Sequence, residues 1–170
     1  GIDSKVIYNK IDKKRFNKKV SGKKIIEKYN LKNKKVLLYV GRIAPHKGVH
    51  LLLQSFKIIK NNISNSKLII AGKPTFNNYF RNLKKLADSD IIFTGFVEDK
   101  ALPYYYAACD VYVTASLWEG FDLPAAEAQA CGKSVVTFNI GSHPEIVKKG
   151  ILVEKENIKK FSEAVIRLLR

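Results

Sequence analysis

The sequence predicts an α/β fold, a Rossmann-like parallel sheet of about six strands with helices on both faces. From residue 35 onward, short apolar segments that end at a glycine or a polar turn alternate with longer amphipathic segments, which is the rhythm of successive β and α elements. None of the short segments alternates strictly between apolar and polar residues, as expected for parallel strands covered on both faces. The 170 residues and 46% hydrophobic content suit one domain with a core and exclude disordered or collagen-like chains.

The expected elements follow the chain in order. Strands are expected at residues 35–40, 67–71, 90–94, 110–114, 134–138 and 150–153. A helix is expected between the first two strands, where apolar side chains recur at helical spacing at Val49, Leu52, Leu53, Phe56, Ile59 and Ile63. The other helices are expected near residues 77–87, 100–108, 124–131, 143–148 and 157–169, with a short one around residues 20–29.

The formal charge of +16 is concentrated at the start of the chain, where 13 of the 31 Lys and Arg residues lie within the first 35 positions. We interpret residues 1–34 as a basic leader or hinge segment and residues 35–170 as the folded domain. Such a segment attracts the phosphates of nucleic acid or of an anionic membrane, without reading sequence and in a salt-sensitive way. A solvated basic surface that keeps the protein soluble explains the same charge.

Cys109 and Cys131 lie in apolar segments without the C-x-x-C spacing of a redox or zinc site, so we expect reduced core residues and a cytoplasmic protein. No apolar run approaches the length of a membrane span. The chain begins at Gly1 and contains no methionine, which indicates a piece of a longer protein.

In the predicted fold, ligands bind beyond the carboxyl ends of the strands. The first strand is followed there by residues 41–48, which begin with Gly41 and carry Arg42 and Lys47. A guanidinium and an ammonium group beside a helix N-terminus can converge on a diphosphate. The turn matches neither the glycine pattern of dinucleotide sites nor that of nucleotide triphosphatases. A glycine turn with two solvated cations is the alternative.

The turn after the fourth strand places two carboxylates eight positions apart, Glu119 in the loop and Glu127 about one turn into a helix that starts near Leu123. Both could face one cleft and bind sugar hydroxyls. An acid and base pair for glycoside hydrolysis is conceivable, but the nearby cations favour a phosphate-bearing ligand. The alternatives are ordinary surface and helical glutamates, with Asp122 as a helix N-cap.

The turn after the fifth strand, residues 139–145, again brings a glycine and a proline to a helix start. Backbone amides near Gly141 and Ser142 could meet a phosphate or a sugar hydroxyl, with Glu145 as a further acceptor. The spacing of Ser142 and Glu145 is equally that of a capping box, a purely structural pattern. The spacing alone does not decide between the two interpretations.

Taken in order, these turns resemble the donor-binding C-terminal domain of the GT-B glycosyltransferases, specifically the retaining family 4 (glycosyl transferases group 1). The matching segments are residues 6–12 with Phe16 as a hinge, Gly41-Arg42 with Lys47-Gly48, Thr94-Gly95-Phe96-Val97, the pair Glu119 and Glu127, and Gly141 with Pro144-Glu145. The fold expected from this resemblance is one half of a GT-B fold.

The resemblance implies that Arg42 and Lys47 bind a donor diphosphate and stabilise the charge that develops on the leaving nucleotide, with Glu119 beside the transferred sugar. It implies that Phe96 and Val97 flank the base. Glu127 would accept from the ribose hydroxyls. The other donor-binding residues that it implies are Gly41, Gly120, Phe121, Asp122, Leu123, Gly141, Ser142 and Glu145.

The implied donor is a nucleotide sugar, UDP- or GDP-linked, with no metal and no other cofactor. The implied partner is an N-terminal acceptor-binding domain outside this chain. The basic charge of the leader separately suggests an anionic membrane surface as a further partner, and no specific nucleic acid is expected. The domain alone should bind donor with little transfer. Asp122 and Ser142 depart from the family pattern, which more often has glycine at both positions, so the sugar is not specified.

Two other classes remain open. A GT-B-like sugar-nucleotide epimerase or phosphorylase would share the architecture. A basic nucleic-acid-binding module would bind through the leader with an affinity that falls as salt rises, and would ignore nucleotide sugars.

Overall fold

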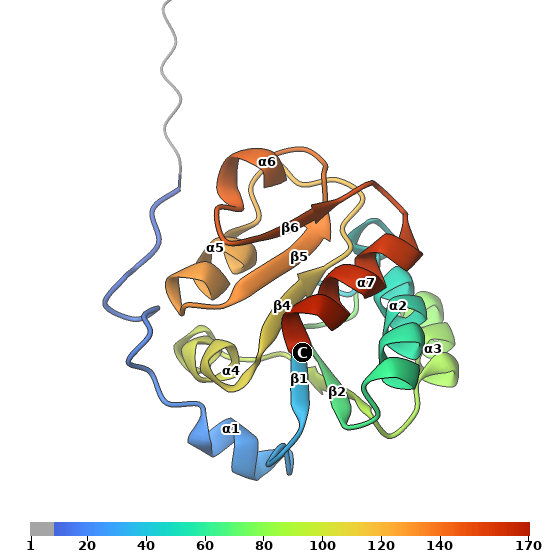
Figure 1. Ribbon diagram of the computed structural model, residues 1–170, viewed down its shortest axis with the longest axis horizontal. Coiled ribbons are helices and arrows are strands. Elements are labelled where there is room, and N and C mark those ends of the chain that lie inside the picture. The colour runs from blue at the N-terminus through green and yellow to red at the C-terminus, as the bar shows by residue number, and fades with distance from the viewer. Residues whose placement is uncertain (1–8) are drawn as a thin grey trace, which may run out of the picture.

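The computed structural model describes residues 9–170 and contains the predicted six-stranded sheet (Figure 1). Its strands are β1 (Lys35–Val40), β2 (Ser66–Ala71), β3 (Ile91–Gly95), β4 (Val111–Thr114), β5 (Ser134–Phe138) and β6 (Gly150–Val153). All neighbouring strands are parallel, in the order β3-β2-β1-β4-β5-β6. The chain builds outward from β1 in one direction and then returns to β4 on the other side. The strand order therefore reverses between β1 and β4, where ligands bind in folds of this kind.

The helices are α1 (Lys23–Lys28), α2 (Val49–Asn62), α3 (Asn77–Leu86), α4 (Leu102–Ala108), α5 (Leu123–Ala130), α6 (His143–Ile146) and α7 (Ile158–Leu169). Short 3₁₀ turns, Pro45–Lys47 and Asp99–Ala101, precede α2 and α4. α1 begins three residues after the predicted start at residue 20. α6 ends at Ile146, two residues before its predicted end. The reason is that the amides of Lys148 and Lys149 donate to Gln129 Oε1 at 2.8 and 2.9 Å and turn the chain out of the helix.

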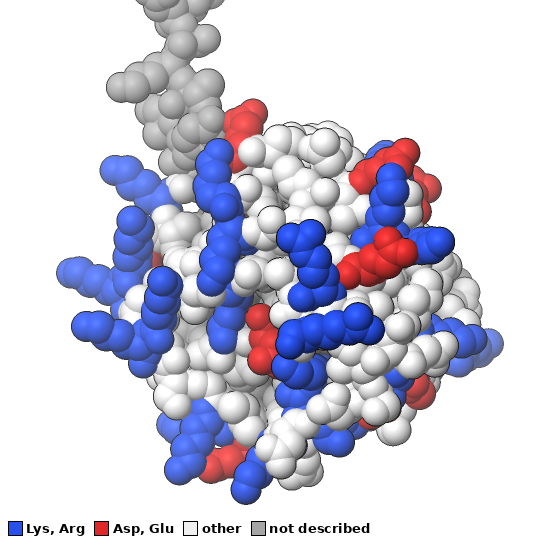
Figure 2. Space-filling view, viewed as in Figure 1, with Lys and Arg blue, Asp and Glu red and all other residues white. Residues whose placement is uncertain are grey.

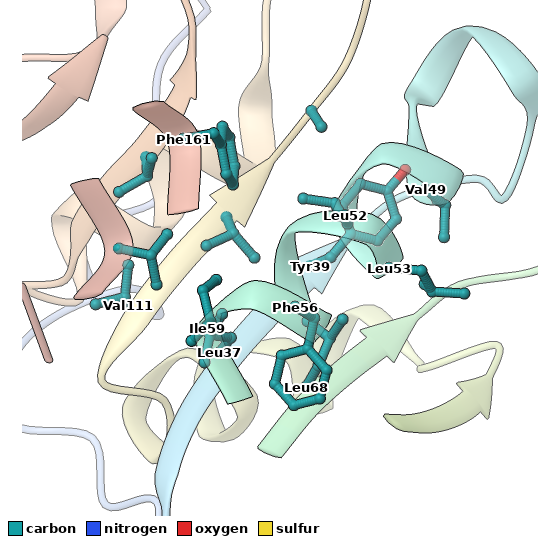
Figure 3. Close-up of a cluster of buried hydrophobic side chains, with 14 of the residues drawn as sticks. Leu37, Tyr39, Val49, Leu52, Leu53, Phe56, Ile59, Leu68, Val111 and Phe161 are labelled. Carbon is teal, nitrogen blue, oxygen red and sulfur yellow. The ribbon is translucent and has the colours of Figure 1, made fainter. Parts of the chain in front are cut away.

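The core has two layers, one on each face of the sheet. Leu37 and Tyr39 of β1 pack in a cluster with residues from α2, α3 and α7 (Figure 3). Val36 and Leu38 pack on the opposite face with residues from α1, α4 and α5. Each strand side chain is thus buried whichever way it points, which explains the absence of polar alternation in the sequence.

Part of the N-terminal segment belongs to the same core. Phe16, Ile25 and Leu31 are buried in the second cluster, and the Phe16 ring meets the Tyr106 ring edge-on at 5.9 Å. Residues on both sides of position 34 therefore share one hydrophobic core. Of the hinge-like residues 6–12, the first three lie outside the described residues.

The lysines of the N-terminal segment are mostly exposed. Figure 2 shows Lys and Arg side chains gathered on the side of the molecule that this segment and α1 form. Within residues 9–170, no helix is both long and apolar enough to cross a bilayer. Cys109 and Cys131 are buried and unpaired, and burial raises the pKa of the Cys109 thiol to about 12.

Candidate functional site

Two adjoining cavities open at the carboxyl ends of the strands. The polar cavity, of about 220 Å³, is lined by residues of the turns after β1 and β4. The apolar cavity, of about 380 Å³, is lined by the turns after β1, β2 and β3 and by the start of α4. Val40, Gly41 and Arg42 line both cavities, so the turn after β1 forms the wall between them.

The turn after β1 keeps its shape through a glycine and a close approach to β4. Gly48 has φ +64°, and a Cβ there would lie 1.8 Å from the carbonyl oxygen of Ala115. No side chain fits that space. The amide of Leu117 donates to the His46 carbonyl at 2.9 Å. The turns after β1 and β4 are therefore packed together before any ligand arrives.

Two buried tyrosines fix the carbonyl groups on either side of Gly41. The Tyr39 hydroxyl donates to the Arg42 carbonyl at 2.8 Å, and the Tyr112 hydroxyl donates to the Val40 carbonyl at 3.2 Å. Both rings are at most 1% exposed. Both phenols have a raised pKa, chiefly because of burial, so they remain hydrogen-bond donors at physiological pH.

Backbone hydrogen bonds continue across the first three strands beyond their ends. The amide of Gly72 donates to the Gly95 carbonyl at 2.9 Å. The amide of Ile43 donates to the Lys73 carbonyl at 2.8 Å, and the Ile43 carbonyl accepts from Thr75 at 3.0 Å. The floor of the apolar cavity is consequently a hydrogen-bonded extension of the sheet.

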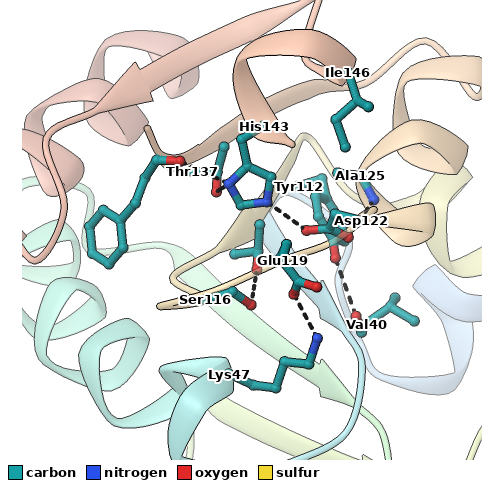
Figure 4. Close-up of polar contacts among 12 residues, drawn as sticks. Val40, Lys47, Tyr112, Ser116, Glu119, Asp122, Ala125, Thr137, His143 and Ile146 are labelled. Atoms are coloured by element: carbon teal, nitrogen blue, oxygen red, sulfur yellow. Dashed lines mark hydrogen bonds and ion pairs between the residues drawn. The ribbon is translucent and has the colours of Figure 1, made fainter. Parts of the chain in front are cut away.

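The predicted catalytic residues Arg42, Lys47 and Glu119 all line the polar cavity. Lys47 Nζ lies 2.7 Å from Glu119 Oε1, and the two side chains are only 19% and 9% exposed (Figure 4). Arg42 is exposed and forms no ion pair with any carboxylate among residues 9–170. One cation is thus neutralised within the cavity, whereas the other is open to an anion.

Asp122 also lines the polar cavity, and both oxygens of its carboxylate contact other residues of the protein. Oδ1 accepts from the Ala125 amide at 3.1 Å, so the predicted N-cap of α5 is confirmed. Oδ2 lies 3.1 Å from His143 Nε2, a contact drawn in Figure 4. Gly41, Phe121 and Leu123, also predicted, line the same cavity.

The turn after β5 supports the site without lining either cavity. Gly141 has φ +47°, and a Cβ there would lie 2.2 Å from the Glu119 carbonyl oxygen. The Ser142 amide, predicted to meet a ligand, instead donates to that same oxygen at 3.2 Å. The capping-box interpretation of this turn is wrong, because the Ser142 side chain makes no capping hydrogen bond. Glu145 lies in α6 and likewise lines neither cavity.

Glu127 lies apart from Glu119. Its Oε2 accepts from the Tyr106 hydroxyl of α4 at 2.7 Å, and it lines neither cavity. Burial raises the pKa of this carboxyl, with the Tyr106 hydrogen bond acting in the opposite direction. Glu127 and Glu119 thus do not line the same cavity in this structure, and the expectation that both face one cleft stays a prediction.

Phe96 and Val97 line the apolar cavity, as do Pro74 and Leu102. The Phe96 ring is 64% exposed, and Lys73 Nζ lies 4.7 Å from its centre. An exposed ring at the mouth of an apolar cavity is a stacking surface for a flat, aromatic group. A neighbouring ammonium also favours an anionic substituent on that group.

Sequence reasoning did not single out Tyr39, Lys73, Tyr112 or His143. The tyrosines stand within apolar strands and look like ordinary core residues. His143 gave no local signal, since its partner Asp122 is 21 positions away. Among residues 9–170, no group of three or more His, Cys, Asp or Glu side chains is arranged to hold a metal ion.

The chain matches the glycosyl transferases group 1 family over residues 21–170. It is 29% identical to spore coat protein SA of Bacillus subtilis, over 98% of this chain and 49% of that protein. It is 33% identical to the uncharacterized glycosyltransferase MJ1607 of Methanocaldococcus jannaschii, over 97% of this chain and 44% of that protein. The chain therefore spans about half the length of these curated relatives or slightly less.

The fold is also that of solved glycosyltransferase structures. Anabaena Alr3699/HepE, crystallised with UDP and glucose, superposes with a TM-score of 0.88 at 25% identity, over 98% of this chain and 47% of that one. The C-terminal domain of the group 1 protein LpcC from Francisella tularensis superposes with a TM-score of 0.71 at 22% identity, over 94% of this chain and 96% of that one. The sequence match and these superpositions agree that the chain belongs to the glycosyl transferases group 1 family and has the Rossmann-like fold of a GT-B C-terminal domain.

Proposed function

We propose that this chain is the donor-binding half of a retaining, family 4 glycosyltransferase that moves a sugar from a UDP- or GDP-sugar to a glycan, a glycolipid or a small acceptor. The observation that carries the proposal is the pair of adjoining cavities that share the turn after β1: one is apolar, and the other, at the β1–β4 switch point, is lined by cations and carboxylates. A nucleotide sugar has the same sequence of chemistry, from base to diphosphate to sugar. The Anabaena relative was crystallised with UDP and glucose.

The base, the diphosphate and the sugar of the donor each have a part of the two cavities with matching chemistry. The base enters the apolar cavity against Phe96 and Val97. The diphosphate crosses the shared turn, where Arg42 and Lys47 meet it. The sugar lies in the polar cavity beside Glu119. Phe121 and Leu123 complete the wall of that cavity, and Gly120 lies between Glu119 and Asp122 in the chain. Gly141 and Ser142 contact the Glu119 backbone and support the wall. Glu145 is proposed as a further acceptor for the donor.

In the transfer step the bond between the sugar and the diphosphate breaks, and negative charge develops on the departing nucleotide. Arg42 and Lys47 stabilise that charge by electrostatics, in the role that a divalent metal has in other enzymes. No metal or other cofactor is part of the proposal. We assign Glu127 to the ribose hydroxyls through Oε1, since Tyr106 holds Oε2.

The acceptor site, in this proposal, belongs to an N-terminal domain outside this chain, so the chain alone binds donor and transfers little. The proposed location is the cytoplasm, at the surface of an anionic membrane, because the exposed lysines of the N-terminal segment can contact acidic lipids. Co-sedimentation with vesicles, with and without acidic lipid, tests this part. Equal recovery with both vesicles would refute it.

Calorimetric titration with UDP, GDP, ADP and their sugar conjugates, at two salt concentrations, tests the donor site. Base-selective binding is expected. Arg42→Ala should weaken it by about 1.5–3 kcal/mol, or roughly 10- to 150-fold, since a charge-assisted hydrogen bond is lost. Arg167→Ala, on α7, is the matched control.

An unchanged affinity in Arg42→Ala would remove the turn after β1 from the site. Binding of any polyanion that vanishes at high salt would favour the nucleic-acid alternative. Deletion of residues 1–34 is unsuitable for testing that alternative, because it also removes Phe16, Ile25 and Leu31 from the core. Replacing exposed lysines of this segment by glutamine removes charge and keeps the packing.

A further inference from the structure

His143 is fully buried at the start of α6, and both of its ring nitrogens are engaged. Nδ1 lies 2.8 Å from both the Thr137 hydroxyl and the Phe138 carbonyl oxygen, at the end of β5. Nε2 lies 3.1 Å from Asp122 Oδ2 (Figure 4). A proton on Nε2 is donated to the Asp122 carboxylate, and a proton on Nδ1 is donated to the Phe138 carbonyl, because both of these oxygens can only accept; the Thr137 hydroxyl can serve Nδ1 as donor or acceptor.

The residue that His143 holds is part of the polar cavity. Asp122 is 4% exposed and lines that cavity, and its other oxygen caps α5 through the Ala125 amide. His143 itself lines neither cavity. The side-chain contact that links His143 to the cavity is therefore the one with Asp122.

A second link holds the other end of the same loop. The Glu119 carbonyl accepts from the Ser142 amide at 3.2 Å, and Gly141 allows the two backbones to approach. The segment from Glu119 to Asp122 is thus fastened at both ends to the turn after β5. Its position does not depend on a ligand.

We infer that His143 is a positioning residue for the sugar side of the donor site, acting through Asp122 on the wall formed by residues 119–122. This inference rests on the function proposed above. Both Asp122 oxygens already have a partner, so Asp122 serves as the wall and the helix cap. Glu119 is then the carboxylate of this segment that can turn toward a sugar hydroxyl.

The two ends of the donor should respond differently to loss of His143. The diphosphate meets Arg42 and Lys47 on the turn after β1, which His143 does not contact. The sugar lies against residues 119–122, whose position His143 fixes through its contact with Asp122. The affinity gained by adding the sugar, measured as the ratio of the UDP and UDP-glucose dissociation constants, should therefore depend on His143. The affinity for UDP alone should not.

The test compares His143→Leu, His143→Gln and the control His50→Leu in the full 170-residue chain, by titration with UDP and UDP-glucose and, in parallel, GDP and GDP-mannose. His50 is also a histidine bonded to a hydroxyl, that of Tyr79, but it lines neither cavity. His143→Leu should reduce the ratio roughly tenfold, as for the loss of a hydrogen bond to a charged group, and change the diphosphate affinity by less than about twofold. His143→Gln should restore most of the ratio, because its amide N–H can still reach Asp122.

An unchanged ratio in His143→Leu, or an equal loss for both ligands, would overturn the inference. A readout without ligand is the Ala125 amide, which donates to Asp122. The NMR shift of this amide should change, and its hydrogen exchange should accelerate, in His143→Leu but not in His50→Leu. An unchanged Ala125 signal in His143→Leu would also overturn the inference. If His143→Leu fails to fold, Thr137→Val, which removes the hydroxyl that contacts Nδ1, replaces it in both measurements. If the wild type binds no nucleotide, the proposed function fails, and the Ala125 signal still decides whether His143 holds Asp122.

Discussion

Replacing Glu119 by glutamine should tighten the binding of a nucleoside diphosphate, although Glu119 is itself placed in the proposed site. In the ligand-free structure Lys47 is bound to Glu119 rather than free. A diphosphate must take the ammonium group away from that carboxylate, and it must also approach the carboxylate's negative charge. The neutral amide of glutamine holds Lys47 less strongly than the carboxylate does. It also carries no negative charge to repel the diphosphate.

The size of the effect follows from the geometry. The two charged atoms are 2.7 Å apart, and with side chains 19% and 9% exposed the pair is poorly screened by solvent. A charge-assisted hydrogen bond contributes about 1.5–3 kcal/mol, and a neutral one about 0.5–1.5 kcal/mol. Moving the Lys47 ammonium from residue 119 to the diphosphate therefore costs about 1–1.5 kcal/mol less in Glu119→Gln than in the wild type. The dissociation constant of the diphosphate should fall by roughly five- to tenfold.

Titration calorimetry with UDP and GDP measures this change directly. For the sugar conjugates the gain should be smaller, because the amide introduced by Glu119→Gln binds a sugar hydroxyl less well than a carboxylate does. The matched control is Glu154→Gln, which breaks an exposed pair with Lys160, at 3.4 Å, and should leave affinity unchanged. Equal or weaker binding of the diphosphate by Glu119→Gln would refute the reasoning, since it would mean that Lys47 does not leave Glu119 to meet phosphate.

Two further predictions concern the fold. Gly141→Ala should lower the free energy of unfolding by about 1–3 kcal/mol in chemical denaturation, because its methyl group would collide with the Glu119 carbonyl and its φ is positive; a wild-type midpoint would contradict this. Asp90 is paired with Lys60 and Lys67, and its hydrogen bonds to these lysines hold the pKa of its carboxyl below the usual range. A carboxyl with a depressed folded-state pKa stabilises the fold above its unfolded pKa and loses that contribution as the pH falls through the folded value. The difference in Tm between wild type and Asp90→Asn should therefore be present at neutral pH and shrink in acid below about pH 4, and a difference that is constant with pH would contradict the pairing.

The sheet could be predicted because its signal is local. Each strand is a short apolar run between turns, and the burial of β1 on both faces is already visible in its unbroken apolar sequence. The end of α6 could not be predicted in the same way. It depends on Gln129 reaching the amides of Lys148 and Lys149 from another helix.

In the candidate site, too, features that depend on neighbouring residues could be predicted, and features that depend on distant residues could not. The interpretation of Asp122 as a helix N-cap depends on a contact three residues away and is confirmed, whereas the capping-box interpretation of Ser142 is wrong. Ser142 has φ −78° and ψ −8°, a helical conformation in place of the extended one that usually presents a capping side chain. The pairs Lys47–Glu119, Tyr106–Glu127 and Asp122–His143 join residues 21 to 72 positions apart, so they depend on tertiary packing that no local pattern contains.

The ladder of hydrogen bonds beyond β1, β2 and β3 restricts how this edge can change during evolution. Inserting one residue between Gly41 and Ile43 would shift Ile43 out of register with Lys73 and Thr75. The neighbouring turn would lose its partners at the same time. Variation in donor preference at this edge is therefore more accessible through exchange of side chains such as Lys73 and Phe96 than through lengthening or shortening of the turns.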